Sequence, residues 1–252
     1  MKYTLQGLIE QYEKGELLKY LFFWGHTDRD NKEVGKSVLS QWYESPFTVN
    51  KVTYKTAEHW MMAQKALLFG DKNNHDKIIA AESPKEAKKL GQEVSNFDGE
   101  IWDKHKFEIV TAGSIHKFIQ NKEMGEYRLR TGQSIIAEAS PVDAIWGTGM
   151  AQDHKDIYNL YLWRGQNLLG FALMEARDFI NEHGFIKHLN KSIEAPWNKF
   201  PDEHPTDMFW RMGIGEDYLI RFAKYYQSLS ERDKVIYKLY NPVTACWSDF
   251  YD

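Results

Sequence analysis

The sequence predicts a mostly helical α+β protein with a small β-sheet and a C-terminal extension. Helical hydrophobic patterns outnumber short strand-like runs between residues 4 and 182, which favours the α+β class. After Gly184 the sequence becomes rich in Trp, Tyr and Phe and holds four of the seven prolines. We therefore expect a main domain over residues 1–182 and an aromatic-rich, partly helical extension over residues 183–252.

Two elements are expected before residue 27. The apolar spacing of residues 4–19 predicts a short amphipathic helix. Residues 20–24, Tyr-Leu-Phe-Phe-Trp, form a β-prone run that predicts a buried strand. The end of this strand places Trp24 and His26 at a rim, and we expect no catalytic role for His26.

A hairpin and the central helix follow. Residues 47–54 predict two strands around a tight turn at Asn50-Lys51. The stretch 56–69 predicts a helix, because Thr56 can cap its N-terminus and no Gly or Pro interrupts the run before Gly70.

The rest of the main domain is predicted as helices with one strand. Ser83-Pro84 starts a helix with a Ser cap and Pro at the first position, and this helix should end near Gly91. The remaining expected elements are a long helix from Trp102 through Ile119, a short helix over 121–131, a strand over 134–139, a glycine-bearing loop over 141–149 and an amphipathic helix after 165–170 that runs through Ile180. In the extension, one helix over 216–228 interrupts a sequence that we expect to be irregular.

The central helix carries an acid and an amine on one face. At about 3.6 residues per turn, this face holds Glu58, Met61, Met62, Lys65 and Phe69. Glu58 and Lys65 are seven residues apart, so about 10 Å separates their Cα atoms along the axis. An i,i+4 salt bridge is excluded, but both side chains could converge on a ligand. A solvated or structurally paired Glu and Lys would show the same spacing, so both interpretations stay open.

Composition excludes several kinds of function. The formal net charge of −4 gives the whole surface no strong attraction for duplex nucleic acid. The single Cys246 excludes an intrachain disulfide and a metal site made of cysteines. No apolar run approaches the roughly 20 residues of a membrane span, and no signal-peptide pattern stands at the N-terminus. We therefore expect a cytoplasmic protein without a membrane partner.

Sequence motifs for metals, phosphates and serine nucleophiles are also missing. The nine His residues show neither His-x-x-x-His nor His-Glu-x-x-His spacing. The sequence contains no Walker loop, no Gly-x-Gly-x-x-Gly after a strand and no Gly-x-Ser-x-Gly elbow. We expect a site without metal or cofactor, built from Glu, Lys, Asp and aromatic side chains.

Several short motifs between residues 20 and 180 form an ordered set. They are Phe23, Ser40-Gln41-Trp42, Ser45-Pro46-Phe47, Ala57-Glu58-His59, Ala63-Gln64-Lys65, the run 84–91 (PKEAKKLG), Trp102-Asp103, the run 138–143 (EASPVD), Trp146-Gly147 and the run 165–170 (GQNLLG). In this order they resemble the NADAR family, also called YbiA-like. The family usually has Ser-Asn-Phe where this chain has Ser40-Gln41-Trp42.

The resemblance implies a YbiA-like fold and N-glycoside hydrolysis. Some members of the family act on phosphoribosylamino intermediates of riboflavin synthesis, and others remove ADP-ribose from guanine. Our leading hypothesis is a metal-independent glycohydrolase that takes ADP-ribosylated guanine, in nucleic acid or nucleotide, and releases ADP-ribose. Such an enzyme would be paired in function with an ADP-ribosyltransferase. The alternatives are hydrolysis of a phosphoribosylaminouracil of the riboflavin pathway and a non-catalytic module that binds ADP-ribose or NAD.

The chemistry of both substrates suits a Glu–Lys site. Each substrate is a glycosylamine, whose sugar can open to an imine that a neutral Lys amine could intercept. We expect Lys65 to be this amine, with its pKa lowered by apolar neighbours, and Glu58 to move the protons. Asp143 is the third candidate catalytic residue. It could bind ribose hydroxyls, assist proton transfer or merely cap a turn.

Substrate binding is expected from aromatic, amide and glycine residues. Trp42, Trp102 and Trp146 could sandwich a base or border the sugar, although each could equally belong to the core. Asn167 could bond a phosphate or a ribose, or cap the helix that it precedes. The full set of expected binding residues is Phe23, Trp24, Gln41, Trp42, Trp102, Trp146, Gly147 and Asn167.

Overall fold

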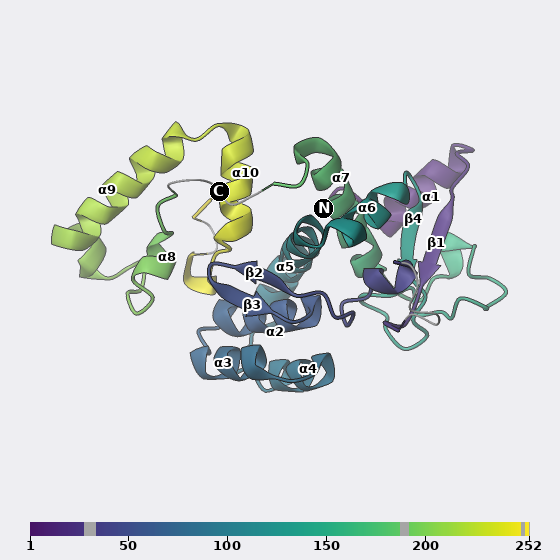
Figure 1. Ribbon diagram of the computed structural model, residues 1–252, viewed down its shortest axis with the longest axis horizontal. Helices are drawn as coiled ribbons and strands as arrows, with labels where there is room; N and C mark the ends of the chain where they lie inside the picture. Colours follow the sequence, from purple (N-terminus) through teal and green to yellow (C-terminus); the bar gives the residue numbers. More distant parts are fainter. Residues whose placement is uncertain (28–33, 187–191, 248–249, 252) are drawn as a thin grey trace.

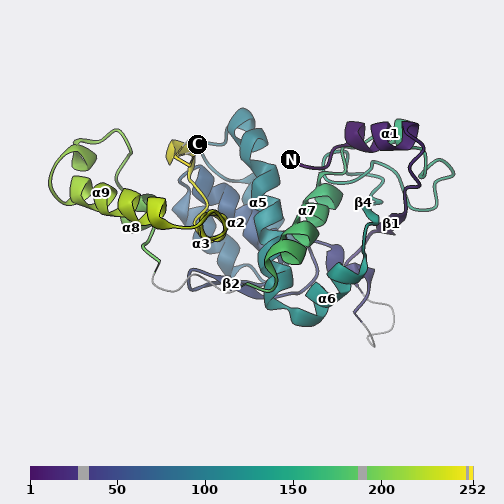
Figure 2. The same cartoon turned by 90° about the horizontal axis from the view of Figure 1, so that it is seen from above.

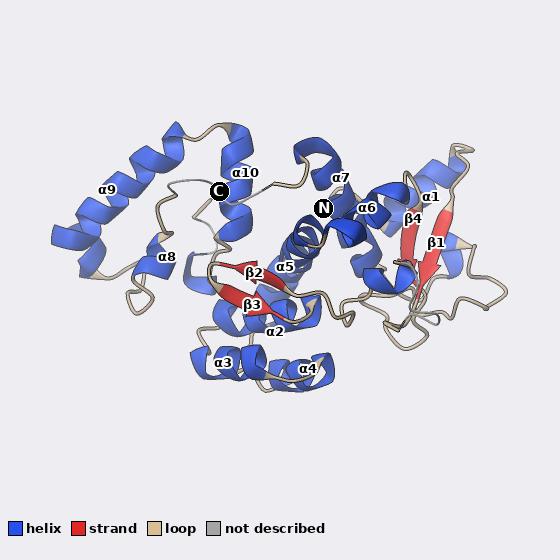
Figure 3. Ribbon diagram, in the orientation of Figure 1, coloured by secondary structure: helices blue, strands red, loops and turns tan. Residues whose placement is uncertain are grey.

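A computed structural model describes residues 1–27, 34–186, 192–247 and 250–251 of the chain. Helices dominate, and the strands form two short pairs (Figure 3). The predicted mostly helical α+β class is therefore confirmed. The extension lies at one end of the elongated molecule and the N-terminal helix toward the other (Figure 1).

The first strand pair is parallel and joins distant parts of the chain. Strand β1 (Tyr20–Phe23) pairs with β4 (Ile135–Glu138), and the register places Phe23 opposite Glu138. Because the strands run in the same direction, both end at the same edge of the pair. The residues that follow Phe23 and Glu138 therefore start from neighbouring points.

The second strand pair is the predicted hairpin. Strands β2 (Phe47–Val49) and β3 (Val52–Tyr54) are antiparallel. The two turn residues between them, Asn50 and Lys51, have φ angles of 48° and 70°. Positive φ at both central positions is typical of a type I′ turn, which suits the twist of a hairpin.

Helix α2 (Ala57–Leu68) is the predicted central helix. Its N-cap is Thr56, whose hydroxyl accepts a hydrogen bond from the backbone N–H of His59. Helices α3 (Lys72–Ala80) and α4 (Pro84–Gln92) pack against it. Helix α4 starts and ends close to the predicted positions, whereas α3 has no counterpart in the sequence prediction.

The remaining helices of the main domain build the core. Helices α5 (Gly99–Gln120) and α7 (Leu168–His183) lie side by side in its centre (Figure 2). Helix α2 packs on α5, and strand β4 packs on α7. The other elements are α1 (Leu5–Glu13), α6 (Lys122–Arg130) and the 3₁₀ turns η1 (Lys36–Leu39) and η2 (Leu160–Leu162).

The predicted helix over residues 4–19 is too long. Helix α1 ends at Glu13, and Gly15 follows with φ 81°. A glycine in the left-handed region is the usual way to stop a helix. The apolar residues after it therefore belong to the approach to β1.

The extension contains more helix than predicted. Besides α9 (Gly213–Ser228), which covers the predicted helix, it holds α8 (Pro196–Lys199), α10 (Glu231–Tyr240) and the 3₁₀ turns η3 (Met208–Arg211) and η4 (Ala245–Trp247). The expectation of an otherwise irregular sequence is wrong for α10, where Ser230 accepts a hydrogen bond from the N–H of Asp233 at the helix start.

Two hydrophobic clusters hold the extension together. Trp197, Trp210 and Trp247 form a small aromatic cluster of their own. Three buried residues of α10, Ile236, Leu239 and Tyr240, belong instead to the core of the main domain. Within the described parts of the chain, no helix has the length and apolarity that crossing a membrane requires.

Candidate active site

Glu58 occupies the N-terminal turn of α2 and is almost fully buried, with 6% of its surface exposed. Its backbone N–H donates to the carbonyl of Gln41 at 3.0 Å. Burial raises the pKa of its carboxyl to about 7, and the charge of Asp143 acts in the same direction. The charge of Lys88 and a hydrogen bond from the Trp42 indole act against this increase.

Glu138 is a second carboxyl in the same site. Burial raises its pKa to about 7, assisted by the charges of Asp143 and Glu58 and opposed by Lys88. Among the described residues, its Oε2 atom is buried and has no hydrogen-bond partner. A carboxyl group in such surroundings gains a proton readily near neutral pH.

Glu138 was missing from the site residues expected from sequence. The available signals were its place near the end of the strand predicted over 134–139 and at the start of the motif run 138–143. In proteins with parallel strands, ligands usually bind beyond the carboxyl ends of the strands. Strand β4 ends beside the end of β1, so Glu138 lies at such a position. The sequence alone did not reveal that these two strands, more than a hundred residues apart, are neighbours.

Asn167 fixes the position of Glu138. Its side-chain oxygen accepts from the N–H of Glu138 at 3.0 Å, and its amide nitrogen donates to the carbonyl of Ile136 at 2.9 Å. It also stands at the N-cap of α7, although its side chain makes no capping bond there. The residue expected to bind substrate thus uses its amide to hold β4 against the start of α7.

Asp143 and Gly147 shape the loop after β4. One oxygen of Asp143 accepts from the N–H groups of Ile145 and Trp146, at 2.9 and 2.7 Å. Asp143 therefore caps a turn, which was one of the roles expected from the sequence. Its charge also raises the pKa values of Glu58 and Glu138. Gly147 packs so closely that an added Cβ would lie 2.9 Å from the carbonyl oxygen of Glu138.

Lys88 is the amine that the fold brings to these carboxyl groups. Helix α4 approaches α2 closely at Gly91, where an added Cβ would lie 2.1 Å from the Met62 sulfur. This contact places the exposed Lys88, three residues earlier, within electrostatic reach of Glu58 and Glu138. Sequence reasoning did not select Lys88, because its neighbour Glu58 lies on another helix.

Lys65 lies further along α2. Its Nζ donates to the carbonyl of Gly91 at 2.8 Å and lies 4.2 Å from the ring centroid of Phe97 and 5.7 Å from that of Trp102. Gly91 belongs to the last turn of α4, whose carbonyls have no partner within the helix. Desolvation lowers the pKa of Lys65. The amine thus caps α4, and its covalent role stays a prediction.

The other expected binding residues differ in burial and in their contacts. Phe23 is buried opposite Glu138, whereas Trp24 is 60% exposed. Gln41 is 8% exposed, and neither polar atom of its side chain has a partner among the described residues. Trp42, Trp102 and Trp146 are half-buried, and the exposed His26 ring lies 5.6 Å from that of Trp42.

The arrangement is suited to proton transfer. Two carboxyl groups with pKa values near 7 can each donate or accept a proton at neutral pH, which is the requirement for general acid–base catalysis. Because they act on each other, they titrate as a pair. Across the described ranges, no group of three or more His, Cys, Asp or Glu side chains is placed to hold a metal ion.

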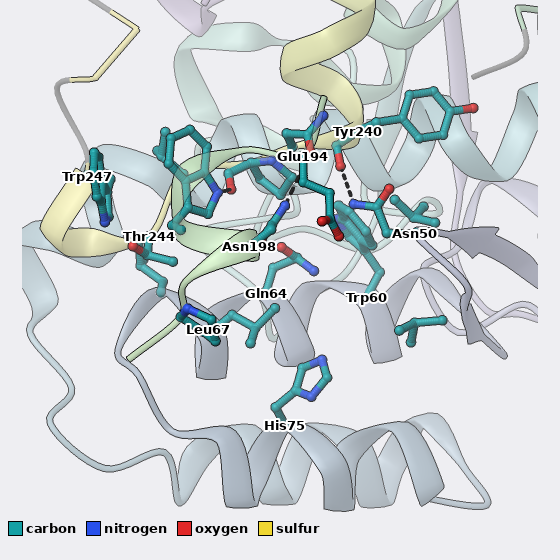
Figure 4. Close-up of a pocket in the computed structure, with 18 of the residues that line it drawn as sticks. Asn50, Trp60, Gln64, Leu67, His75, Glu194, Asn198, Tyr240, Thr244 and Trp247 are labelled. Carbon is teal, nitrogen blue, oxygen red and sulfur yellow. Dashed lines mark hydrogen bonds between the residues drawn. The ribbon is translucent and has the colours of Figure 1, made fainter. Parts of the chain in front are cut away.

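A large cleft lies on the opposite face of α2, between the main domain and the extension (Figure 4). Its volume is about 1900 Å³. Trp60, Gln64 and Leu67 line it from α2, while Asn198 and Trp247 line it from the extension. Glu58, Glu138 and Lys65 do not line this cleft, so the cleft and the chemically unusual groups are separate features.

Fold and site together define a class of protein. It is a helical α+β domain in which a parallel strand pair and the start of a helix bring buried carboxyl groups together. The chain belongs to the NADAR domain family, whose model matches residues 22–181.

Comparison with curated proteins gives relatives of this domain. The chain is 41% identical over 165 residues to N-glycosidase R617 of Acanthamoeba polyphaga mimivirus, covering 64% of this chain and 95% of that protein. It is 30% identical over 133 residues to N-glycosidase YbiA of Escherichia coli, covering 53% and 74% of the two chains. It is also 30% identical over 145 residues to riboflavin biosynthesis protein VVA0006 of Vibrio vulnificus, covering 58% of this chain and 36% of that protein.

The fold resembles that of a solved structure. The NMR structure of Escherichia coli YbiA matches with a TM-score of 0.52 and 23% sequence identity, covering 70% of this chain and 95% of that one. At this identity the match concerns the fold, and it confirms the expected YbiA-like architecture.

Proposed function

We propose that this protein is an N-glycosidase that hydrolyses the bond between ribose C1 and an exocyclic amine. The main support is the pair of buried carboxyl groups, Glu58 and Glu138, whose pKa values lie near 7 beside the amine of Lys88. Relatives named N-glycosidases support the same class of reaction. The leading substrate is ADP-ribosylated guanine, with ADP-ribose and guanine as products.

The reaction needs one proton at the leaving amine and one water at C1. In the proposed mechanism, one protonated carboxyl group gives its proton to the exocyclic amine as the C1–N bond breaks. The other, ionised carboxyl group takes a proton from the water that attacks C1. The base leaves as its free amine and the sugar keeps a hydroxyl at C1, so atoms and charge balance.

A covalent route uses the same groups. The sugar ring opens to an imine at C1, a neutral Lys amine adds to that carbon, and the base amine departs. Water then hydrolyses the new imine and frees the Lys. Lys88, beside the carboxyl groups, is the amine that we favour for this step, and Lys65 is the candidate selected from sequence.

The experiment is to incubate the protein with ADP-ribosylated guanine and, separately, with a phosphoribosylaminouracil, and to follow release of the free base. We expect release from ADP-ribosylated guanine, in mononucleotide or in nucleic acid. Release only from the aminouracil would favour the riboflavin-type alternative, which one relative's name supports. Binding of ADP-ribose without release of either base would point to a non-catalytic module.

A functional partnership follows from the leading substrate. An enzyme that removes ADP-ribose from guanine needs an ADP-ribosyltransferase that puts it there, and we propose such a pairing. It would be supported if co-expression of this protein, but not of its Glu58→Gln variant, protects cells from a guanine-modifying transferase.

A further inference from the structure

A lysine outside the proposed proton-transfer groups is buried beside the site. Lys117 of α5 is 1% exposed. Its Nζ donates to the carbonyl of Ser40 at 2.8 Å and lies 5.8 Å from the ring centroid of Tyr43. Burial lowers the pKa of this amine to about 7. Burying an amine is costly, so a buried lysine often has a role beyond packing.

The carbonyl that Lys117 holds opens the segment Ser40-Gln41-Trp42. This segment makes two contacts with Glu58: the carbonyl of Gln41 accepts its backbone N–H, and the Trp42 indole bonds its carboxyl group. The N–H of Trp42 donates in turn to the Ser40 hydroxyl at 3.2 Å. One hydrogen bond from α5 therefore anchors the segment that touches Glu58 at both its backbone and its carboxyl group.

We propose that Lys117 is a positioning residue, which sets the proton affinity of Glu58 by fixing the Ser40-Gln41-Trp42 segment. It acts without touching the substrate. The expected effect on kcat rests on the proposed function. The effect on the proton affinity of Glu58 does not, because it can be measured without a substrate.

Several groups besides the Ser40-Gln41-Trp42 segment change the pKa of Glu58, and the experiment must separate their effects from that of Lys117. Asp143 from the loop after β4 raises its pKa, Lys88 from α4 lowers it, and the Trp42 hydrogen bond also lowers it. Glu138 of β4 is coupled to it. Loss of Lys117 should loosen the Trp42 bond and so raise the pKa of Glu58 further.

The test uses the full chain with Lys117→Met, which keeps the length of the side chain and removes the amine. The pKa of Glu58 is measured by NMR of its side-chain carboxyl carbon, assigned by its loss in Glu58→Gln. We expect an increase of about 0.5–1 pH unit and, where base release is followed, a roughly 5–20-fold lower kcat with KM nearly unchanged. An unchanged Glu58 pKa would overturn the proposal.

Gln120 provides a matched control on the same helix. Its amide also ties α5 to another segment, bonding both the N–H and the carbonyl of Thr48 in β2. Gln120→Met should lower thermal stability but leave the pKa of Glu58 in place. If it shifts that pKa as much as Lys117→Met does, general loosening of α5 is the cause and the proposal fails.

A double-mutant cycle separates positioning from charge. Removing the Lys117 amine could change Glu58 through space, and such an effect would persist when Trp42 is replaced. If Lys117 acts through the segment, Lys117→Met should shift the Glu58 pKa far less in a Trp42→Phe background than in wild type. Additive shifts would contradict the proposal.

Two further measurements keep the test decisive. If Lys117→Met fails to fold, Lys117→Gln supplies a neutral polar side chain too short to reach Ser40, and the same pKa increase is expected. If neither substrate is turned over by the wild type, the proposed function fails, while the NMR titration still decides whether Lys117 positions Glu58.

Discussion

The two faces of helix α2 carry very different surroundings. One face, with Glu58 and Lys65, packs toward α4 and meets a second buried carboxyl group from β4. The other face, with Trp60 and Gln64, looks into the large cleft beside the extension (Figure 4). The first face carries acids whose pKa values are strongly raised, whereas the second borders a cleft of about 1900 Å³.

Two amide side chains that line the cleft already have hydrogen-bond partners. The amide of Asn50 donates to the carbonyl of Tyr240 at 2.6 Å, and that of Asn198 donates to the side-chain oxygen of Asn241 at 3.2 Å. In the carboxylate site, by contrast, Gln41 and one oxygen of Glu138 lack partners among the residues described. Buried groups without partners are costly, and they are the groups that a substrate can satisfy. We therefore expect the reaction to take place at the carboxyl groups and not in the cleft.

The largest expected effect is on the first face. Glu58→Gln keeps the shape of the side chain but can neither give nor take a proton, so base release should fall by about 10²–10⁴-fold. Multiple-turnover assays on the substrate that the wild type cleaves measure this. A loss smaller than about five-fold would remove Glu58 from the catalytic groups.

The second effect distinguishes the two candidate amines. We expect Lys88→Met to lower turnover by about 10–10³-fold, because it removes the amine whose charge acts on both carboxyl groups. Lys65→Met should cost less if Lys65 only caps α4.

Borohydride added during turnover tests the covalent route for both amines. If a Schiff base forms, the sugar should be trapped on the protein, and peptide mapping identifies the lysine. Trapping at Lys65 would restore the sequence-based assignment, and trapping at neither would favour direct attack by water.

The third effect concerns the pH dependence of the free energy of unfolding. Glu58 has a pKa of about 7 in the folded protein, above its usual value of 4.5, so the folded state binds its proton more tightly than the unfolded state. Glu58 therefore lowers the free energy of unfolding as pH rises from about 4.5 through 7, by an amount on the order of 3 kcal/mol.

Glu58→Gln removes this penalty. Its stability relative to wild type should therefore be greater at pH 8 than at pH 5, measured by urea unfolding at both values. Glu138→Gln should show the same sign, because its carboxyl pKa is also raised to about 7. A gain that is equal at both pH values would contradict the raised pKa values.

The fourth effect is small and concerns the other face. Asn198→Ala changes the wall of the cleft without touching the carboxyl groups, and we expect turnover of a small substrate within about two-fold of wild type. We propose that residues 185–252 shape substrate access instead of supplying catalytic groups, and a small effect would support this role. A loss above ten-fold would indicate that the active site lies in the cleft.

Truncation after Gly184 is a less informative experiment, because it would remove Ile236 and Tyr240 from the core of the main domain.

The smallest expected effect is that of a chelator. EDTA should leave base release unchanged, because the proposed chemistry uses carboxyl groups and an amine. Loss of turnover in EDTA, restored by a divalent cation, would contradict the mechanism. A chelator-resistant control hydrolase excludes interference with the assay.

The sequence alone determined the local elements of this protein. Local signals act over a few residues, so their effects could be predicted without a fold: Thr56 before α2, Ser83 and Pro84 at the start of α4, and Asn50-Lys51 between β2 and β3. Glu58 was also recognisable, since helical spacing places it on a face with Lys65. The family motifs supplied Asp143, Gly147 and Asn167 as candidates.

Only the tertiary structure decided which groups meet. Glu138 joins Glu58 because β4 pairs in parallel with β1, and Lys88 joins them because Gly91 lets α4 approach Met62. Lys65, seven residues from Glu58 on the same helix, is held by the carbonyl of Gly91 instead. The pKa of a buried group depends on charges and dipoles within a few ångströms, most of which come from distant parts of the chain. Spacing within one helix could therefore identify Glu58 as a candidate acid, but it could not identify Glu138 and Lys88 as the groups that meet it.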